Sequence, residues 1–339
     1  MTKSKNINGQ LKQSAATANG HELVSMFVMA YNQVDFIEAT IKSAFAQTYE
    51  NLEIILSDDC SSDGTYEIME RLAAEYQGPL QIRLSRNHEN LGFVGHLNRV
   101  FDLCQGVLIV YAPGDDISHP DRAAELYQAF RKDRPLLVHS DVNNMDEKGN
   151  LTGVTTSRQS VLAGMDLKDA AKSLALGVGA SCAWNPEIHD RFGPVEGKDT
   201  FDDLIFFFRA MLLDRMVHVP KALVDYRLGA GLSRPKATSF KGRIAQERRN
   251  CQRAVDTYMQ RLKDCRNARP ESKDVIDVLH ERLAVNAYML SLFESSFFTV
   301  YQAAFSVQKL KALLSLINRI RKNTSGRQKK RLRQAGKTV

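Results

Sequence analysis

The chain has 339 residues, of which 43% are apolar and 25% are charged, the composition of an ordinary globular protein with one large or two modest domains. Its net charge is +7, but eleven Lys and Arg and no Asp or Glu follow Glu294, so the first 294 residues carry a net charge of −4. Five scattered cysteines without a CxxC pair argue against a disulfide framework or a zinc site, and no apolar signal core or 18-residue apolar run is present, so we expect a cytoplasmic protein without a membrane span.

The first half of the sequence alternates apolar segments of strand length with segments of helical period. After a polar leader over residues 1–21, predicted to be disordered, strands are predicted at 23–30, 52–56, 80–84 and 107–112. Helices are predicted at 35–47, 65–76, 92–103 and 120–131. This alternation predicts an α/β fold with βαβ units and a mostly parallel sheet flanked by helices.

The second half is less regular and becomes helical near its end. Short strands are predicted at 136–139, 216–219 and 222–226, turn residues at 143–153, a short apolar segment at 180–184 and an apolar helix at 203–213. From residue 238 the pattern is helical, with one helix at 241–268 and one or two more over 271–322. We therefore expect a catalytic domain over residues 22–237, a helical region over 238–322 and a basic disordered tail over 323–339.

Paired acids follow two of the predicted strands. Asp58 and Asp59 come after the strand at 52–56, and Asp115 and Asp116 after the strand at 107–112. Ligands of open α/β sheets bind outside the carboxyl ends of the strands. Paired carboxylates at this place indicate a hard divalent cation and a hydrogen-bonded ligand such as a nucleotide diphosphate. Helix capping accounts for Asp63, and a solvated acidic turn is the alternative for the second pair.

Three further positions are candidates, each with a structural alternative. Tyr31 ends the first strand, where its ring can stack on a base or sugar or simply lie at the sheet rim. Asn90 precedes a glycine and a helix, which suits a phosphate contact or a plain turn. Asp203, beside Asp202, opens the apolar helix, where it can act as a general base or as a cap. Trp184 is either a sugar-stacking floor or a core residue.

In this order and on this βα frame, the motifs resemble those of the inverting family 2 glycosyltransferases, which have the Rossmann-like GT-A fold. The resemblance covers residues 23–233. The family's elements DDxSxDGT, NxG…N, DxD, ED…R and YR are matched in turn by Asp58–Thr65, Asn90–Gly92 with Asn98, Gly114–Asp116, Asp202–Asp203 with Arg209, and Tyr226–Arg227. Gly114 replaces the first acid of DxD, and no His follows Tyr226–Arg227, so a third protein ligand for a metal is missing or comes from elsewhere.

The resemblance implies a role for each candidate. The nucleotide of a nucleotide-diphosphate sugar, expected to be a UDP-sugar, would contact Tyr31, Asp58, Asp59 and Asn90. Asp115 and Asp116 would bind the ribose, the diphosphate and a divalent cation, Mn²⁺ or Mg²⁺. Asp203 would deprotonate the acceptor hydroxyl, which attacks the anomeric carbon with inversion. The implied acceptor is a saccharide or lipid-linked saccharide in surface polysaccharide synthesis.

The C-terminal segment allows two interpretations. Residues 296–316 are apolar on more than one face, and a basic run follows them. They can dock at the inner face of an anionic membrane, or they can pack as helices on the catalytic domain or on the partner in a homodimer. Nucleic-acid binding is not expected, because the basic run has no aromatic residues.

Two other functions are compatible with parts of the pattern. A metal-dependent nucleotidyltransferase needs a Gly-rich, basic phosphate loop after the first strand, and residues 30–33 contain neither Gly nor Lys. A non-catalytic binding protein that uses the basic tail as its interface would not require Asp203.

Overall fold

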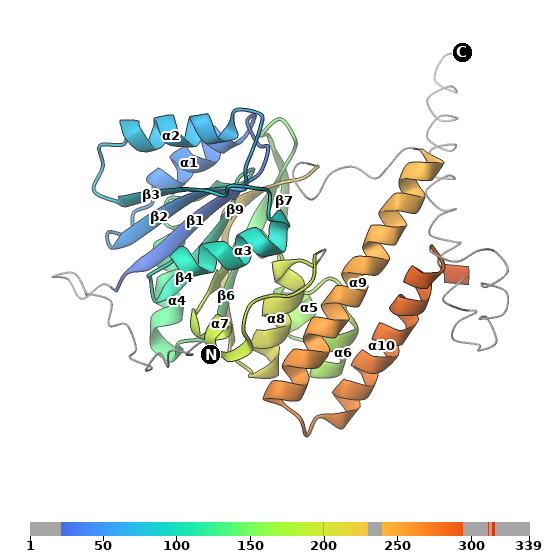
Figure 1. The fold of residues 1–339 in the computed structure, drawn as a ribbon. Coiled ribbons are helices and arrows are strands. Elements are labelled where there is room, and N and C mark those ends of the chain that lie inside the picture. The colour runs from blue at the N-terminus through green and yellow to red at the C-terminus, as the bar shows by residue number, and fades with distance from the viewer. Residues whose placement is uncertain (1–21, 199, 230–238, 294–310, 312–313, 316–339) are drawn as a thin grey trace, which may run out of the picture.

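The computed structural model describes residues 22–198, 200–229, 239–293, 311 and 314–315. At its centre is a nine-stranded sheet with the order β3-β2-β1-β4-β8-β6-β9-β5, and β7 pairs with β6 outside this path. Helices cover both faces of the sheet, and two long helices stand at one side (Figure 1). The predicted leader, the helices expected after residue 293 and the basic tail lie almost wholly outside the described residues. In the part of the chain that is described, no helix is long and apolar enough to cross a bilayer.

The first half of the sheet is parallel, as predicted. Its strands are β1 (Val24–Ala30), β2 (Leu52–Asp58), β3 (Gln81–Arg86) and β4 (Leu108–Pro113). β1 lies between β2 and β4, in parallel register with both. The connecting helices are α1 (Ile37–Phe45), α2 (Thr65–Glu75) and α3 (Gly92–Leu103). Because parallel strands end at one edge, the segments that follow β1, β2 and β4 meet there.

The second half of the sheet mixes directions. Its strands are β5 (Ile117–Ser118), β6 (Leu137–Met145), β7 (Leu151–Thr156), β8 (Cys182–Trp184) and β9 (Met216–Arg227). β8 is antiparallel to β4 and to β6, β7 is antiparallel to β6, and β5 is antiparallel to β9. Only β6 and β9 are parallel here. The predicted parallel arrangement is therefore found among β1–β4 and between β6 and β9.

Two local predictions in this half were wrong. The turn expected at 143–153 is shorter, because β6 continues to Met145 and forms a hairpin with β7. Asp146 closes that turn by accepting hydrogen bonds from the backbone N–H of Lys148 at 2.9 Å and of Asn150 at 2.8 Å. The two strands expected at 216–219 and 222–226 are the single strand β9, whose register shifts around Pro220, a residue without an N–H for the ladder.

Side-chain alternation along β1 divides the core into two layers. Val24, Met26 and Val28 pack with α1, α2 and α4 (Arg122–Asp133) on one face. Phe27 and Met29 pack on the opposite face, whose layer includes α3, α7 (Glu187–Phe192) and α8 (Asp202–Leu212). Strand side chains alternate between faces, so a strand buried on both faces is apolar throughout.

Trp184 belongs to the second layer. Its side chain is fully buried, and its ring stacks 5.5 Å from that of Phe101 and 5.6 Å from that of Tyr111. The core alternative therefore holds, and the sugar-stacking alternative does not. Short elements complete the region before α8: α5 (Gln159–Leu162), α6 (Leu167–Lys172) and the 3₁₀ turn η1 (Gly179–Ser181).

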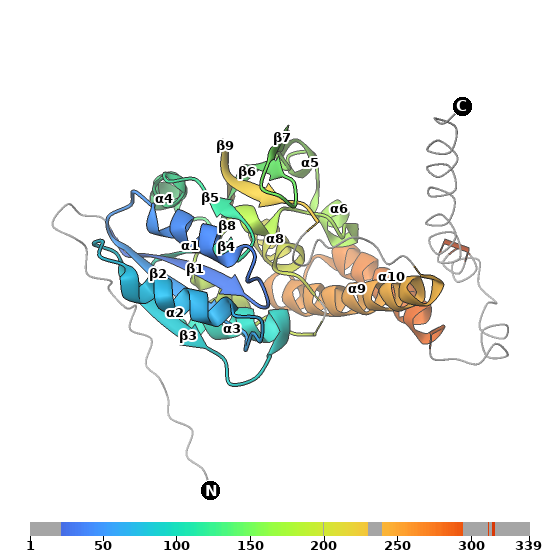
Figure 2. The ribbon, with the colours of Figure 1, turned by 90° about the horizontal axis from the view of Figure 1, so that it is seen from above.

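The C-terminal helices α9 (Phe240–Ala268) and α10 (Lys273–Ser291) form a hairpin beside the sheet (Figure 2). The predicted helix at 241–268 is thereby confirmed. α9 contacts α8 through charged side chains that are fully buried. Arg209 of α8 pairs with Asp264 at 2.8 Å, and Arg261 donates to the carbonyl oxygen of Leu204 at 2.7 and 2.9 Å. Arg209, matched to the ED…R motif, thus joins two helices in the core.

Candidate active site

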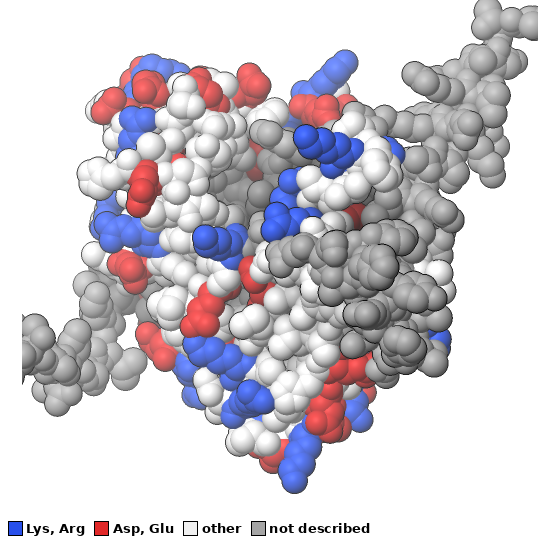
Figure 3. All heavy atoms as spheres, turned by 45° about the vertical axis from the view of Figure 1, so that its right-hand side comes forward, with Lys and Arg blue, Asp and Glu red and all other residues white. Residues whose placement is uncertain are grey.

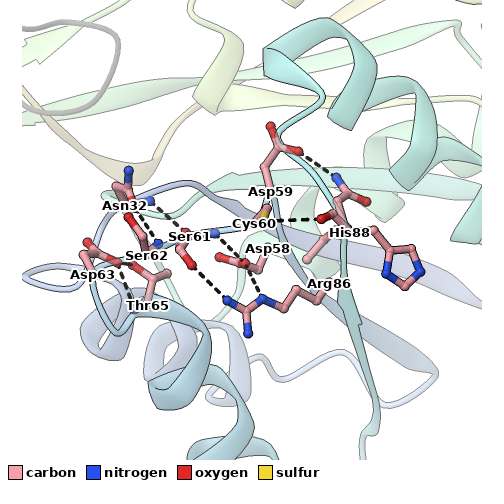
Figure 4. A network of polar contacts seen from close by, with 12 residues as sticks. Asn32, Asp58, Asp59, Cys60, Ser61, Ser62, Asp63, Thr65, Arg86 and His88 are labelled. Atoms are coloured by element: carbon pink, nitrogen blue, oxygen red, sulfur yellow. Dashed lines mark hydrogen bonds and ion pairs between the residues drawn. The ribbon is translucent and has the colours of Figure 1, made fainter.

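The turn after β2 is organised by Asp58. This side chain is fully buried, and its Oδ2 accepts a hydrogen bond from the Ser61 backbone N–H at 2.9 Å. Arg86 of β3 pairs with the same oxygen at 3.5 Å and donates to the Ser61 carbonyl oxygen at 2.9 Å (Figure 4). Cys60 takes the left-handed conformation, with φ of 62°. The Oδ1 atom of Asp58 is buried and has no hydrogen-bond partner among the described residues, so half of this carboxylate remains for a ligand.

Asp59 connects the same turn to the start of α3. Its Oδ1 accepts hydrogen bonds from the Asn87 side chain at 2.8 Å and from the Leu91 backbone N–H at 2.9 Å. Asn90 accepts from the backbone N–H of Gly92 at 2.8 Å, which is the turn alternative stated for that residue. Asp63 precedes Gly64, the N-cap residue of α2, and accepts a hydrogen bond from the Thr65 N–H at 3.0 Å, so it shapes the turn into this helix. Both acids of the first pair therefore shape the loops around the sheet edge.

Tyr31 stands at the end of β1 between the two acidic turns. Its side chain is 48% exposed, so its ring is accessible to a flat ligand. The next residue, Asn32, has φ of 51° and donates its backbone N–H to the Ser61 hydroxyl at 2.9 Å. Ala30 pairs with Asp58, and Met29 pairs with Pro113, in the two ladders that flank β1. The two pairs of acids therefore lie on either side of the end of β1.

The second acidic pair follows Gly114, which fits a space too small for any side chain. A Cβ at this position would lie 2.2 Å from the Gln33 Oε1 and 2.9 Å from the Ala30 Cβ. The absence of an acid at the first position of the motif therefore has a steric cause. Asp115 and Asp116 are both buried, 8% and 4% exposed.

Arg227, at the end of β9, holds this pair in place. Its backbone N–H donates to Asp116 Oδ1 at 2.7 Å, and its Nε donates to the Asp115 carbonyl oxygen at 2.9 Å. Asp116 Oδ2 is buried without a hydrogen-bond partner among the described residues. Burial raises the pKa of Asp116 well above its usual value, the charge of Asp115 adds to this rise, and the Arg227 N–H opposes it. Such a site favours a bound cation.

The third acidic pair opens α8. Asp202 Oδ2 and Asp203 Oδ1 are both buried and have no hydrogen-bond partner among the described residues. Burial and the charge of Asp203 raise the pKa of Asp202 well above its usual range. Burial raises the pKa of Asp203 to about 6, while the hydrogen bond from the Leu204 N–H and the charge of Arg261 lower it. The two carboxyls therefore differ: the pKa of Asp202 lies well above its usual range, whereas the pKa of Asp203, about 6, leaves that side chain mostly ionised at neutral pH.

One buried side chain, that of Arg122, connects the elements that carry the second and third pairs. Arg122 is fully buried and donates to the Tyr111 carbonyl oxygen at 2.7 Å and to the Ala180 carbonyl oxygen at 2.6 Å. These bonds join β4, which leads to Asp115, to the η1 turn. A Cβ on Gly179 of that turn would lie 2.5 Å from Asp202 Oδ2, so η1 is in close contact with the third pair.

The buried Tyr111 hydroxyl shows how near the acids are to one another. Burial raises its pKa well above the usual value, and the charges of Asp202, Asp115 and Asp116 add to the rise. One carboxylate from α8 and two from the end of β4 therefore act on the same side chain. Asp202 and the pair Asp115–Asp116, about ninety residues apart in the sequence, thus both lie close enough to Tyr111 for their charges to act on it.

Sequence reasoning missed Arg122 and Arg227 as organisers of the site. Arg227 was noted only as part of the late YR element, and Arg122 only as a member of a predicted helix. A signal for Arg122 was present, because an arginine within an apolar helix face needs buried acceptors. Within the described residues, no group of three or more His, Cys, Asp or Glu is arranged to hold a metal ion.

Comparison with known sequences gives a consistent result. Residues 25–184 match the family model described as glycosyl transferase family 2. The chain is 33% identical over 141 residues to a chondroitin synthase of Escherichia coli, a match that covers 41% of this chain and 20% of the relative. It is 29% identical over 147 residues to an E. coli UDP-Glc:alpha-D-GlcNAc-diphosphoundecaprenol beta-1,3-glucosyltransferase, covering 43% of this chain and 56% of the relative. The matches thus span a fifth and little more than half of these two relatives.

Solved structures with the same fold include two nucleotide-sugar complexes. TarS of S. aureus in complex with UDP-GlcNAc has a TM-score of 0.57 at 16% identity, over 88% of this chain and 81% of that one. A mannosyltransferase of Pyrobaculum calidifontis in complex with GDP-Man and Mn²⁺ has a TM-score of 0.56 at 19% identity, over 94% and 91%. The predicted GT-A fold is therefore confirmed, and the likeness extends past residue 233 into the C-terminal helices.

Proposed function

Because residues 25–184 form a domain of glycosyl transferase family 2, we propose that the protein transfers a sugar from a nucleotide-diphosphate sugar to a hydroxyl of a saccharide or lipid-linked saccharide, with inversion at the anomeric carbon. The observation that carries this proposal is the convergence of Asp115, Asp116 and Asp202 around Tyr111 at the carboxyl edge of the sheet. Because Asp203 follows Asp202 at the start of α8, the proposed base would then lie beside a donor site at the end of β4.

The donor nucleotide would lie across the ends of β1 and β2. The exposed Tyr31 ring offers a stacking surface, and the free Oδ1 of Asp58 can accept a hydrogen bond from a base N–H. Asp59 and Asn90 would act beside them by fixing the loops that face the nucleotide. A UDP-sugar is the proposed donor: the diphosphoundecaprenol-dependent relative is named for UDP-Glc, and TarS was solved with UDP-GlcNAc.

A divalent cation, Mn²⁺ or Mg²⁺, fits the second acidic pair. Asp116 has a buried oxygen without a described partner and Asp115 adds a second carboxylate, a hard, anionic donor set for such ions. When bound, the ion would supply positive charge that stabilises the departing diphosphate. Arg227 would hold Asp116 in position for this contact.

In the proposed reaction, Asp203 accepts the proton of the acceptor hydroxyl while the hydroxyl oxygen forms a bond to the anomeric carbon. The bond from that carbon to the diphosphate oxygen breaks, and the nucleoside diphosphate leaves with the bonding electron pair. Attack opposite the leaving group inverts the configuration. The raised pKa of Asp203, about 6, makes it a stronger base than an ordinary carboxylate while leaving it ionised at neutral pH.

A donor screen tests the proposal directly. UDP-, GDP- and dTDP-sugars are incubated with the protein, with and without Mn²⁺, and hydrolysis and thermal shift are recorded. Preference for one nucleotide, strengthened by Mn²⁺, is the expected result. If no nucleotide sugar is bound or hydrolysed under any condition, the transferase proposal is wrong.

Asp116→Asn is expected to weaken Mn²⁺ binding in the presence of UDP by about tenfold or more, because a negative ligand is lost while Asn can still accept the Arg227 N–H bond. Calorimetric titration with Mn²⁺ measures this without requiring turnover. Asp121→Asn, which removes a partly exposed acid paired with Lys221, is the matched control. Equal Mn²⁺ affinity in wild type and Asp116→Asn would contradict the assignment.

The pH dependence of kcat/KM is expected to reflect Asp203. Because burial raises the pKa of this base to about 6, activity should fall about tenfold per pH unit below pH 6 and level off above pH 7. The profile is measured at saturating Mn²⁺ with a fixed acceptor. A rate that stays constant down to pH 5 would exclude a base with this pKa.

Surface polysaccharide synthesis is the proposed biological setting, since the two named E. coli relatives make or extend polysaccharide chains or lipid-linked sugars. Membrane docking and a homodimer through the C-terminal helices remain proposals from the sequence. The residues that suggest them, 296–339, lie almost entirely outside those that the structure describes.

A further inference from the structure

A pocket with a volume of about 480 Å³ opens between the segment that precedes α8 and the N-terminal half of α9. Figure 3 shows Lys and Arg side chains along the rim of a hollow near the centre of this face. The pocket shares no lining residue with the three acidic pairs. The side chains and backbone that matter for its chemistry are those of Gly197, Lys198, Arg248, Arg249, Gln252 and Asp256.

The lining is positively charged. Among the lining residues that the structure describes, Lys198, Arg248 and Arg249 are cationic and Asp256 is acidic. That carboxylate already accepts hydrogen bonds from the Lys198 backbone N–H at 3.0 Å and from the Gln252 amide at 2.8 Å. A pocket with this balance attracts anions, and the guanidinium group matches phosphate and carboxylate oxygens in particular.

The wall formed by residues 196–198 is anchored to α9. Gly197 has φ of 90°, and a Cβ there would lie 2.8 Å from the Asp256 Cβ, so the backbone touches the helix where only glycine fits. The Glu196 backbone N–H donates to the Gln260 side chain at 2.9 Å, and the Glu196 carboxylate pairs with Lys263. The pocket is therefore built into the junction of α8 and α9.

The same junction carries the proposed catalytic base. Phe201 precedes Asp202 and Asp203, and the Arg253 guanidinium lies 3.9 Å from the centre of its ring. One residue earlier, the hydroxyl of Thr200 is 2.9 Å from that of Thr257. Arg253 is one helical turn from Arg249 on α9. Arg253 is thus one turn from the pocket and near enough to Asp203 for its charge to lower the pKa of that carboxyl, so it links the pocket to the proposed base from the α9 side.

We propose that this pocket binds an anionic group, a phosphate or a carboxylate, carried by the saccharide acceptor near the hydroxyl that is glycosylated. The inference rests on the proposed transfer function and names the chemical class of its acceptor. The donor diphosphate belongs at Asp115 and Asp116, so a second site for an anion, on the other side of the base, serves the other substrate.

The first test measures anion binding without catalysis. Inorganic phosphate is titrated calorimetrically in EDTA into the full chain, into Arg248→Gln/Arg249→Gln and into Arg266→Gln/Arg269→Gln. The first variant should bind phosphate about tenfold or more weakly, since two charge-assisted hydrogen-bond donors are lost. The control loses the same charge at the C-terminal end of α9, about 28 Å away along the helix axis, and should bind like the wild type. Unchanged affinity in the first variant would overturn the inference.

The second test uses acceptors of defined charge with the donor found in the screen. p-Nitrophenyl glucuronide and glucose 6-phosphate are compared with p-nitrophenyl glucoside, which separates the carboxylate and phosphate sources. Arg248→Gln/Arg249→Gln should lower the ratio of kcat/KM for the preferred anionic acceptor over the neutral one about tenfold or more, mainly through KM, whereas the control should keep the ratio. An unchanged ratio would overturn the inference even where the donor is hydrolysed. If the double variant binds phosphate more weakly but the wild type turns over no nucleotide sugar, the transferase proposal is wrong and the anion site is supported.

Discussion

Asp203→Asn is expected to lower kcat by about 10³-fold while nucleotide-sugar binding is retained. The substitution keeps the shape of the side chain but removes the group that accepts the proton of the acceptor hydroxyl, and general-base catalysis contributes a factor of this size. Binding is measured by calorimetry with the donor and Mn²⁺, and turnover by release of the nucleoside diphosphate. Normal turnover in Asp203→Asn would show that the base lies elsewhere.

Asp202→Asn is the matched control for this experiment. Burial and the charge of Asp203 raise the pKa of Asp202 well above its usual range, so an isosteric amide replaces a carboxyl that is disfavoured as a charged group, and kcat should fall by no more than about tenfold. Equal losses in the two variants would mean that the pair acts as a unit. A large loss of kcat in Asp202→Asn alone would identify Asp202, and not Asp203, as the base.

Stability separates loss of chemistry from loss of fold in these variants. The folded pKa of Asp203, about 6, lies above its value of 3.8 in the unfolded chain. Stability from the protonated form is therefore present below pH 3.8 and is lost as pH rises towards 6. Above pH 6 the ionised side chain is a cost, so Asp203→Asn should have the same melting temperature as the wild type or a higher one.

The second large effect is expected at Asp264. Asp264→Ala should destabilise the protein by about 3–5 kcal/mol, because the fully buried Arg209 would lose the carboxylate that it pairs with at 2.8 Å. Loss of this contact also loosens α9 from α8 and so disturbs the base and the basic pocket. Unfolding by guanidinium chloride, followed by circular dichroism, measures the change.

Lys263→Ala is the control for the buried pair. Lys263 is the preceding residue on the same helix, and its pair with Glu196 is exposed to solvent, with 47% and 57% of the side chains accessible. Its removal should cost no more than about 1 kcal/mol. Arg209→Met/Asp264→Leu should recover most of the stability lost in Asp264→Ala, because apolar side chains avoid burying charge. A destabilisation of Asp264→Ala no larger than that of the control would show that the pair is not structural.

Local patterns were sufficient for much of the fold. The strand and helix periods of residues 22–131 predicted β1–β4 and α1–α4 to within a few residues at each end, and the bounds of α3 coincide with the prediction. The candidate acids were also found this way, because each pair directly follows a strand or opens a helix. The continuity of β9 was not predicted, because Pro220 and the register shift beside it make one strand look like two in the sequence.

What the amino-acid order determined by itself was the strands and helices of β1–β4, α1–α4 and α9 and the places where acids follow them, since both depend on neighbouring residues. Only the tertiary structure decided which side chains hold the site together. The sequence does not show which groups Arg122, Arg209 and Arg227 contact, and each is buried by acceptors from distant segments. Burial of a charge depends on partners that close over it from elsewhere in the chain, and no local pattern encodes those partners.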